Sequence, residues 1–154
     1  MLDCEEFIEK NKLFKRGEII GVGCSGGSDS MALLHYLATN QEKFDIEVVA
    51  IHVDHAIREN SYMDADFVRE KAKELGVRFY KFRVDAPRIA HEKGISLETA
   101  ARQARYGVFK SLIQKGVIDK IALAHHMSDQ AETILMHIFR GSGIAGAKGM
   151  SPIS

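Results

Sequence analysis

The spacing of hydrophobic residues alternates along the chain between that of strands and that of helices. Short apolar runs rich in β-branched residues predict strands over residues 18–24, 47–53, 78–84 and 119–124. Between them, apolar residues recur at helical spacing and predict helices over residues 29–39, 61–75, 85–93, 97–115 and 128–140, after a weaker leading helix over 2–14. Strands and helices therefore alternate through nearly the whole sequence.

This alternation predicts an α/β fold in three layers, with a mainly parallel, Rossmann-like sheet covered by helices on both faces, because parallel neighbours need crossover connections. In such sheets, ligands bind beyond the carboxyl ends of the strands. That rule selects residues 24–30, residues 53–61, the region near Asp85, and residues 125–132. The unusual polar residues of the chain lie in these segments.

Composition narrows the class of protein. The 154 residues fit one domain, and 21 basic against 21 acidic residues leave no net charge to favour a nucleic-acid partner. No apolar run is long enough to span a membrane, the amino terminus does not resemble a secretory signal, and Cys4 and Cys24 form no CxxC pair. We expect a cytoplasmic protein, and the Gly/Ser/Pro-rich end suggests the N-terminal part of a longer one. Its oligomeric state, a homodimer included, stays open.

The stretch GVGCSGGSDS, residues 21–30, predicts a phosphate-binding loop of one of two kinds. Its first six residues spell the dinucleotide pattern G-x-G-x-x-G, but the strand would then be very short. The helix would also carry Gly26 and Gly27 in its first turns, at about 1 kcal/mol each.

The second interpretation places Gly21 and Gly23 inside the strand and the turn at Ser25, Gly26 and Gly27. Backbone N–H groups of such a turn form an anion-binding nest at a helix amino terminus. Ser28 is then expected to cap the helix, with Asp29 and Ser30 in its first turn. A carboxylate beside phosphates is favourable when Mg²⁺ bridges them, so Asp29 is the predicted metal ligand. A small-residue turn with a helix cap is the alternative without a ligand.

The segment SGGSDS resembles the PP-loop of the N-type ATP pyrophosphatases, which have an adenine nucleotide alpha-hydrolase-like fold. Three further stretches are similar to the tRNA(Ile)-lysidine synthases: HVDHAIRENS (52–61), SLETAARQARYGVF (96–109) and AHHMSDQAETILMHIFRGSG (124–143). The resemblance implies an ATP-dependent ligase that joins free L-lysine to C2 of the wobble cytidine of an isoleucine tRNA with a CAU anticodon. An adenylated cytidine is the intermediate, and AMP and pyrophosphate are released.

The resemblance also implies site residues. Ser25, Gly26, Gly27, Ser28, Asp29 and Ser30 would bind ATP, with Mg²⁺ on Asp29. Arg105, in the element AARQARY, and Asp129 would join Asp29 as catalytic residues, Asp129 holding the lysine ammonium. The family often has Asp where this chain has Ser128, so one carboxylate is missing.

Other candidates carry weaker signals. His52, Asp54, His55 and Arg58 follow the second strand, where a histidine is as often a hydrogen-bonded neighbour as a functional group. Asp129, Glu132 and Thr133 would share one face of the predicted last helix, whereas His125 and His126 lack convincing zinc spacing.

Two other function classes are compatible with the loop. A tRNA-thiolating enzyme is disfavoured by the two cysteines, because such enzymes use cysteine ligands or a nucleophilic cysteine. A non-enzymatic adenine-nucleotide-binding module would explain the loop but leaves Arg105 and Asp129 without a role.

Overall fold

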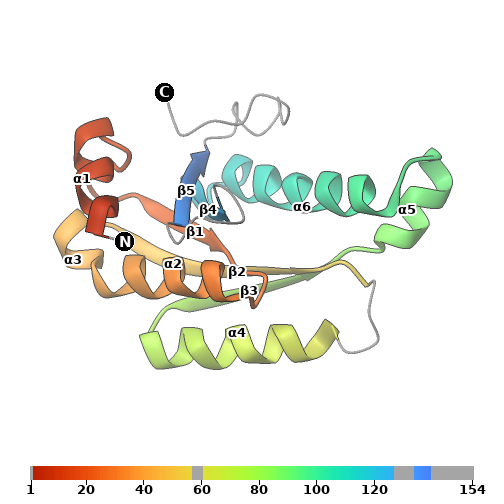
Figure 1. Cartoon of the computed structure of the whole chain (residues 1–154), viewed down its shortest axis with the longest axis horizontal. Coiled ribbons are helices and arrows are strands. Elements are labelled where there is room, and N and C mark those ends of the chain that lie inside the picture. The colour runs from red at the N-terminus through yellow and green to blue at the C-terminus, as the bar shows by residue number, and fades with distance from the viewer. Residues whose placement is uncertain (1, 57–60, 127–133, 140–154) are drawn as a thin grey trace.

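A computed structural model describes residues 2–56, 61–126 and 134–139 of the chain. Its core is one sheet of five strands in the order β3-β2-β1-β4-β5, flanked by helices above and below (Figure 1). The strands are β1 (Ile19–Gly23), β2 (Glu47–Asp54), β3 (Arg78–Arg83), β4 (Lys120–His126) and β5 (Ile134–Phe139). The first four are parallel to their neighbours, as expected, and β5 runs antiparallel to β4.

The helices form the two outer layers. They are α1 (Leu2–Asn11), α2 (Ser28–Thr39), α3 (Gln41–Phe44), α4 (Ser61–Leu75), α5 (Ala86–Lys93) and α6 (Leu97–Gln114). In Figure 1, α2 and α4 lie on one side of the sheet and α6 lies on the other. The predicted three-layer α/β fold is confirmed. None of the helices in the described residues has the length and apolarity needed to cross a membrane.

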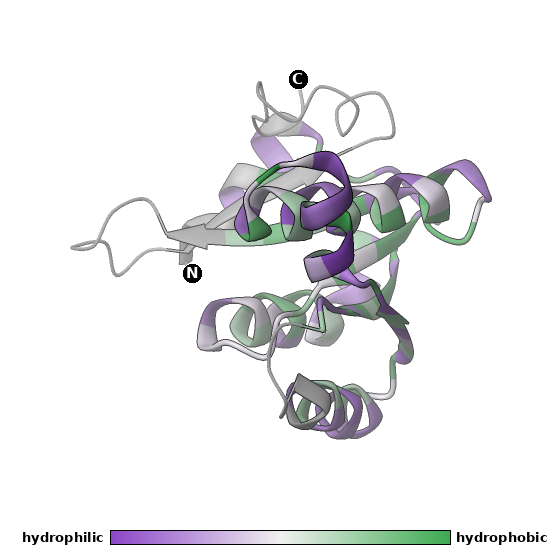
Figure 2. Ribbon diagram, turned by 90° about the vertical axis from the view of Figure 1, so that its right-hand side faces the viewer, coloured by the Kyte–Doolittle hydropathy of each residue, from purple (hydrophilic) through white to green (hydrophobic). Residues whose placement is uncertain are grey.

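Alternate residues of the strands fill two separate cores, because successive side chains of a strand point to opposite faces. Val22 and Val48 pack with the α2 leucines in one cluster. Ile51 and Ile121 pack with Phe109 of α6 in the other. The helices interleave hydrophilic and hydrophobic residues along their length (Figure 2), as amphipathic covering layers do. Burial on both faces explains why β2 is almost continuously apolar.

The prediction of a helix over residues 128–140 is wrong for its described part. Residues Ile134–Phe139 form β5, which pairs with β4 from His126↔Ile134 to Ile121↔Phe139. The segment ILMHIF is apolar at nearly every position, so its periodicity does not separate a strand from a buried helix. Pairing with the outer edge of β4 satisfies the backbone groups that the two strands turn towards each other, and this decides the conformation. Residues 128–133 and 140 lie outside the described part.

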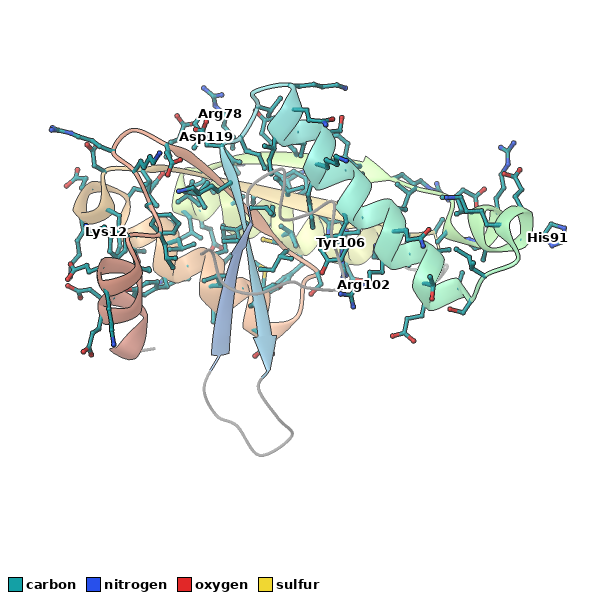
Figure 3. The ribbon with its side chains drawn as sticks, turned by 90° about the horizontal axis from the view of Figure 1, so that it is seen from above. Lys12, Arg78, His91, Arg102, Tyr106 and Asp119 are labelled. Carbon is teal, nitrogen blue, oxygen red and sulfur yellow. The ribbon has the colours of Figure 1, made fainter. Side chains whose placement is uncertain are left out.

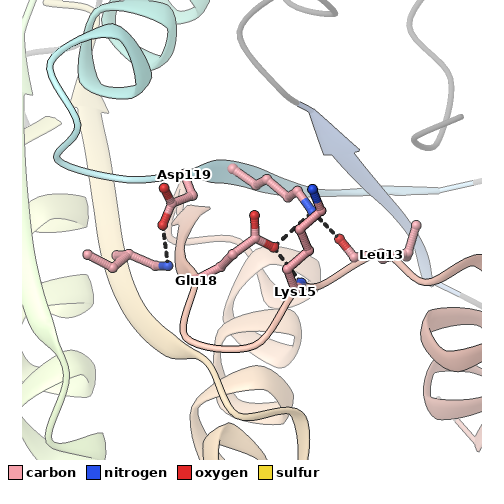
Figure 4. Close-up of polar contacts among 6 residues, drawn as sticks. Leu13, Lys15, Glu18 and Asp119 are labelled. Atoms are coloured by element: carbon pink, nitrogen blue, oxygen red, sulfur yellow. Dashed lines mark hydrogen bonds and ion pairs between the residues drawn. The ribbon is translucent and has the colours of Figure 1, made fainter.

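The amino-terminal edge of the sheet is held by a polar cluster around the buried Lys120 (Figure 4). The Lys120 ammonium, whose side chain is 3% exposed, donates to the Leu13 carbonyl at 2.6 Å and to Glu18 Oε1 at 2.8 Å. The same Glu18 oxygen accepts from the Lys15 N–H at 2.6 Å, and Asp119 Oδ2 accepts from the Ile19 N–H at 2.7 Å. These bonds join the segment that enters β1 to the start of β4.

Candidate functional site

The loop between β1 and α2 adopts the second of the two predicted conformations. The strand ends at Gly23 and the helix begins at Ser28, so the dinucleotide pattern, which needs a helix from about Cys24, is wrong. Gly26 has a φ of +94°, a left-handed conformation that favours glycine. The turn at Ser25, Gly26 and Gly27 is therefore confirmed.

The loop is braced by its own hydroxyl groups. Ser25 Oγ accepts from the Gly27 N–H at 3.2 Å, while the buried Ser30 hydroxyl donates to the Gly27 carbonyl and accepts from the Ser25 N–H, both at 3.2 Å. Ser28 does not cap α2, contrary to the prediction. The extended cap position falls on Gly27, and Ser28 is already the first helical residue.

Asp29 lies in the first turn of α2, directly after Ser28. A carboxylate there is favourable to the helix dipole and stands beside the loop where phosphates would bind. Mg²⁺ is commonly held by one or two carboxylates together with substrate phosphates. The position of Asp29 fits that donor pattern, although its role as a metal ligand stays a prediction.

A pocket of about 110 Å³ opens beside the loop at the carboxyl edge of the sheet. Ser25 of the loop, Ser30 in the first turn of α2 and Arg105 of α6 all line it. The lining residues come from β1, α2, β2, α6, β4 and the loops that follow β1 and β2: Gly23, Cys24, Ser25, Ser30, Ile51, Val53, His55, Arg105, Phe109, Leu123 and Ala124. The tertiary structure thus joins two motifs that lie about 75 residues apart in the sequence.

Gly23 keeps this pocket open because it has no side chain. A Cβ at Gly23 would lie 2.5 Å from Leu123 Cδ2 and 3.1 Å from Phe109 Cζ. The first distance is too short for two carbon atoms and the second is tight, so a side chain here would push Leu123 aside and press on Phe109. Sequence reasoning assigned Gly23 only to the strand. The available signal was Gly21 and Gly23 at alternate positions, which leave the end of one face of β1 without side chains.

Cys24 follows Gly23 in the pocket wall and is buried. Burial raises the pKa of its thiol to about 12, against a smaller opposite effect from the hydrogen bond with the Ile51 backbone. The thiol is therefore protonated near neutral pH. Because the thiolate is the nucleophilic form, Cys24 is poorly suited to sulfur chemistry.

The three polar residues at the end of β2 have different partners. His52 is buried, and its Nδ1 lies 2.7 Å from the Cys24 carbonyl, so it has the structural role that sequence reasoning held open. Asp54 is buried and accepts from the Ala56 N–H at 2.9 Å. His55 lines the pocket, and its Nε2 is buried with no hydrogen-bond partner among the described residues.

Arg105 reaches the pocket from α6. Its Nε is buried and has no hydrogen-bond partner in the described part of the chain. The guanidinium carbon lies 5.3 Å from the centre of the Tyr106 ring, and Arg102 approaches the same ring at the same distance. Tyr106 is buried and packs edge-on against Phe109, which is a packing role. Figure 3 shows Arg102 and Tyr106 together on α6.

A second effect of Arg105 is electrostatic. The pKa of His55 is lowered from its ordinary 6.5, first by burial and then by the positive charge of Arg105. The negative charge of Asp54 partly opposes this shift, and His52 adds to it. His55 is therefore neutral near pH 7.

The remaining candidate residues lie outside the part of the chain that the structure describes. Arg58, Asp129, Glu132 and Thr133 are not among the described residues, and neither are the side chains of His125 and His126. The common helix face predicted for Asp129, Glu132 and Thr133 stays a prediction, and so does the role of Asp129.

Comparison with known proteins identifies the family of this chain. The family model of the PP-loop domain matches residues 3–154, and the chain therefore belongs to the PP-loop domain family. Solved structures with 18% and 15% identity share the fold. A U34-tRNA thiolase NcsA from Methanococcus maripaludis has a TM-score of 0.61 over 80% of this chain and 47% of its own. An NH3-dependent NAD synthetase from Campylobacter jejuni has a TM-score of 0.53 over 78% of this chain and 51% of its own.

Curated relatives are more similar in sequence. The tRNA(Ile)-lysidine synthase of Clostridium acetobutylicum is 45% identical over 147 residues, which is 95% of this chain and 32% of that protein. The enzyme of the same name from Clostridium perfringens is 42% identical over 149 residues, 96% of this chain and 32% of that protein. The chain thus spans about a third of the length of these relatives.

Proposed function

We propose that this chain is the ATP-using catalytic part of a tRNA(Ile)-lysidine synthase. It would join L-lysine to C2 of the wobble cytidine in an isoleucine tRNA with a CAU anticodon. The observation that carries the proposal is the single pocket that Ser25 and Ser30 of the PP-loop motif line together with Arg105. The names of the curated relatives supply the reaction to be tested.

In the first step, the C2 carbonyl oxygen of the cytidine attacks the α-phosphorus of ATP, and pyrophosphate leaves. The loop Ser25–Ser30 would hold the pyrophosphate portion at the amino terminus of α2. Asp29 would hold Mg²⁺, which neutralises phosphate charge when bound. Arg105 offers a buried N–H without a partner among the described residues, so it can donate to an α-phosphate oxygen as charge develops there.

The apolar part of the pocket suits a planar base. Ile51 and Val53 of β2 face Phe109 of α6 and Leu123 of β4, and Gly23 leaves the gap between them open. We assign the adenine of ATP to this gap. Adenine would then be bound by apolar contact, while the serines and Arg105 at the pocket recognise the phosphates.

In the second step, the side-chain amine of lysine attacks C2 of the adenylated cytidine and AMP leaves. We assign the binding of the lysine ammonium to Asp129, the second position of the family's paired carboxylates. Ser128, at the first position, keeps a hydrogen-bonding group but supplies no charge. The proposal therefore requires one carboxylate at this subsite rather than two.

The deciding experiment measures AMP release by the full-length protein with ATP, Mg²⁺, lysine and unmodified tRNA(Ile). Omission of lysine should leave pyrophosphate release dependent on tRNA but prevent AMP and lysidine formation. AMP release that continues without both lysine and tRNA would contradict the proposal. Mass spectrometry of the wobble nucleoside identifies the product independently of the nucleotide assay.

A further inference from the structure

His55 has the properties of a base inside the pocket. It follows β2 directly, lines the pocket together with Ser25 and Arg105, and has a buried Nε2 without a hydrogen-bond partner among the described residues. Its backbone is held in place, because the His55 carbonyl accepts from the Ala86 N–H at 3.3 Å. A buried ring nitrogen with no protein partner is available to a ligand.

The charges around His55 keep its ring neutral. Arg105 faces it from α6, while Asp54 and His52 are the titratable neighbours from its own strand. Burial and Arg105 lower the pKa of His55, and the Asp54 carboxylate only partly restores it. A neutral imidazole has one N–H and one lone pair, so it can accept a proton near pH 7.

His52, three residues earlier, is the contrasting case. Its Nδ1 is 2.7 Å from the Cys24 carbonyl, and the residue is buried in the sheet rather than at the pocket. The oxygen of a carbonyl can only accept, so this contact places a proton on Nδ1. The motif HVDH thus contains one histidine that braces the strand and one that faces the ligand space.

We propose that His55 is a catalytic base that takes the proton from the lysine side-chain ammonium before the amine attacks the adenylated cytidine. This inference rests on the proposed function. The same burial and the same Arg105 charge that act on His55 also disfavour a second cation beside them. These two effects favour loss of the proton from an ammonium that enters the pocket.

An N–H bond of the ammonium breaks, its proton goes to the His55 ring nitrogen, and its electron pair becomes the lone pair of the amine. That lone pair forms the N–C2 bond, and the C2–O bond breaks with its electrons leaving on the AMP oxygen. The nitrogen now on C2 releases a further proton to solvent, and the His55 imidazolium returns its proton to solvent after AMP has left.

The test compares His55→Gln with His91→Gln in the full-length protein. His91 is exposed on α5, at the far end of the molecule from Tyr106 in Figure 3, and serves as the matched control. Formation of the tRNA adenylate is measured first, as pyrophosphate release without lysine. Lysine is then added, and AMP release gives the rate of the second step.

We expect His55→Gln to slow the lysine step about 100-fold at pH 7, the lower end of general-base contributions, and to slow adenylation much less. His91→Gln should match the parent protein in both steps. The defect should shrink about tenfold per pH unit and disappear near pH 9, because an increasing fraction of lysine is then unprotonated without help. Imidazole added to His55→Gly should restore part of the lysine step.

Other outcomes separate the two proposals. Equal losses in both steps, or a defect that does not change with pH, would overturn the role of His55 and leave the proposed function standing. Absence of any tRNA adenylate with the parent protein would overturn the proposed function itself, and the role of His55 with it. A thermal melt of each variant distinguishes loss of the base from loss of the fold.

Discussion

The two edges of the sheet use buried polar groups in opposite ways. At the amino-terminal edge, the Lys120 ammonium has two partners, Glu18 Oε1 and the Leu13 carbonyl. At the carboxyl edge, Arg105 Nε, His55 Nε2 and the Tyr106 hydroxyl are buried without partners among the described residues. An unsatisfied buried polar group costs about 1–3 kcal/mol. The hydrogen-bonded groups at the amino-terminal edge therefore add to the free energy of unfolding. The unpartnered groups at the carboxyl edge lower it, and a ligand that bonds them can restore the loss.

The largest expected effect is at the carboxyl edge. Asp29→Ala removes the carboxylate predicted to hold Mg²⁺ and should lower AMP release by about 10³-fold or more, with an unchanged melting temperature. Asp66→Ala is the matched control, because Asp66 is an exposed residue of α4 whose carboxylate pairs with Arg69. AMP release by the Asp29 variant at the rate of the control would remove its assigned role.

The amino-terminal edge should respond in stability instead. Lys120→Met leaves Glu18 and the Leu13 carbonyl without their charged donor, so we expect a loss of about 3 kcal/mol in the free energy of unfolding. Denaturant unfolding measures this loss. Activity per folded molecule should be unchanged below the unfolding transition. A specific defect in AMP release at full stability would show that the two edges are not separate in function.

The guanidinium group of Arg105 can be tested without removing its charge. Arg105→Lys loses the planar fork of donors and should slow pyrophosphate release about 100-fold. Arg102→Lys is the control on the same helix, since Arg102 stacks over the same Tyr106 ring but does not line the pocket. If both variants lost activity equally, packing on Tyr106 rather than the pocket would explain the effect.

Alanine substitutions at two glycines, Gly23 and Gly107, should have the smallest of these effects. Gly23→Ala places a methyl group 2.5 Å from Leu123 Cδ2, which should cost about 2 kcal/mol in unfolding free energy and weaken ATP binding. Gly107→Ala on α6 meets no atom within 4 Å and should stabilise the protein by up to about 1 kcal/mol. Calorimetry of unfolding and of ATP binding checks both. Unaltered ATP binding by Gly23→Ala would place the nucleotide outside this pocket.

Sequence reasoning was most reliable where local pattern and tertiary packing agree. The four parallel strands and the turn at Ser25–Gly27 were predicted, because a buried parallel strand is apolar on both faces and a glycine turn favours few conformations. It failed for residues 134–139. There the apolar residues fit the spacing of a helix as well as that of a strand, and pairing with the edge of β4 selects the strand. It also placed the cap of α2 one residue late, because Ser28 looks like a cap whereas Gly27 is one.

The sequence by itself determined the layer order of the protein, the site of its anion-binding loop, and the family to which it belongs. These properties depend on local periodicity, on glycine and serine in a short turn, and on motifs that can be compared directly. Only the tertiary structure decided that Gly23, Phe109 and Leu123 shape one pocket, that His52 braces β2, and that His55 faces Arg105. Such relations depend on which side chains of distant segments fill or leave space at one sheet edge, and this is settled by packing between layers rather than by any local pattern.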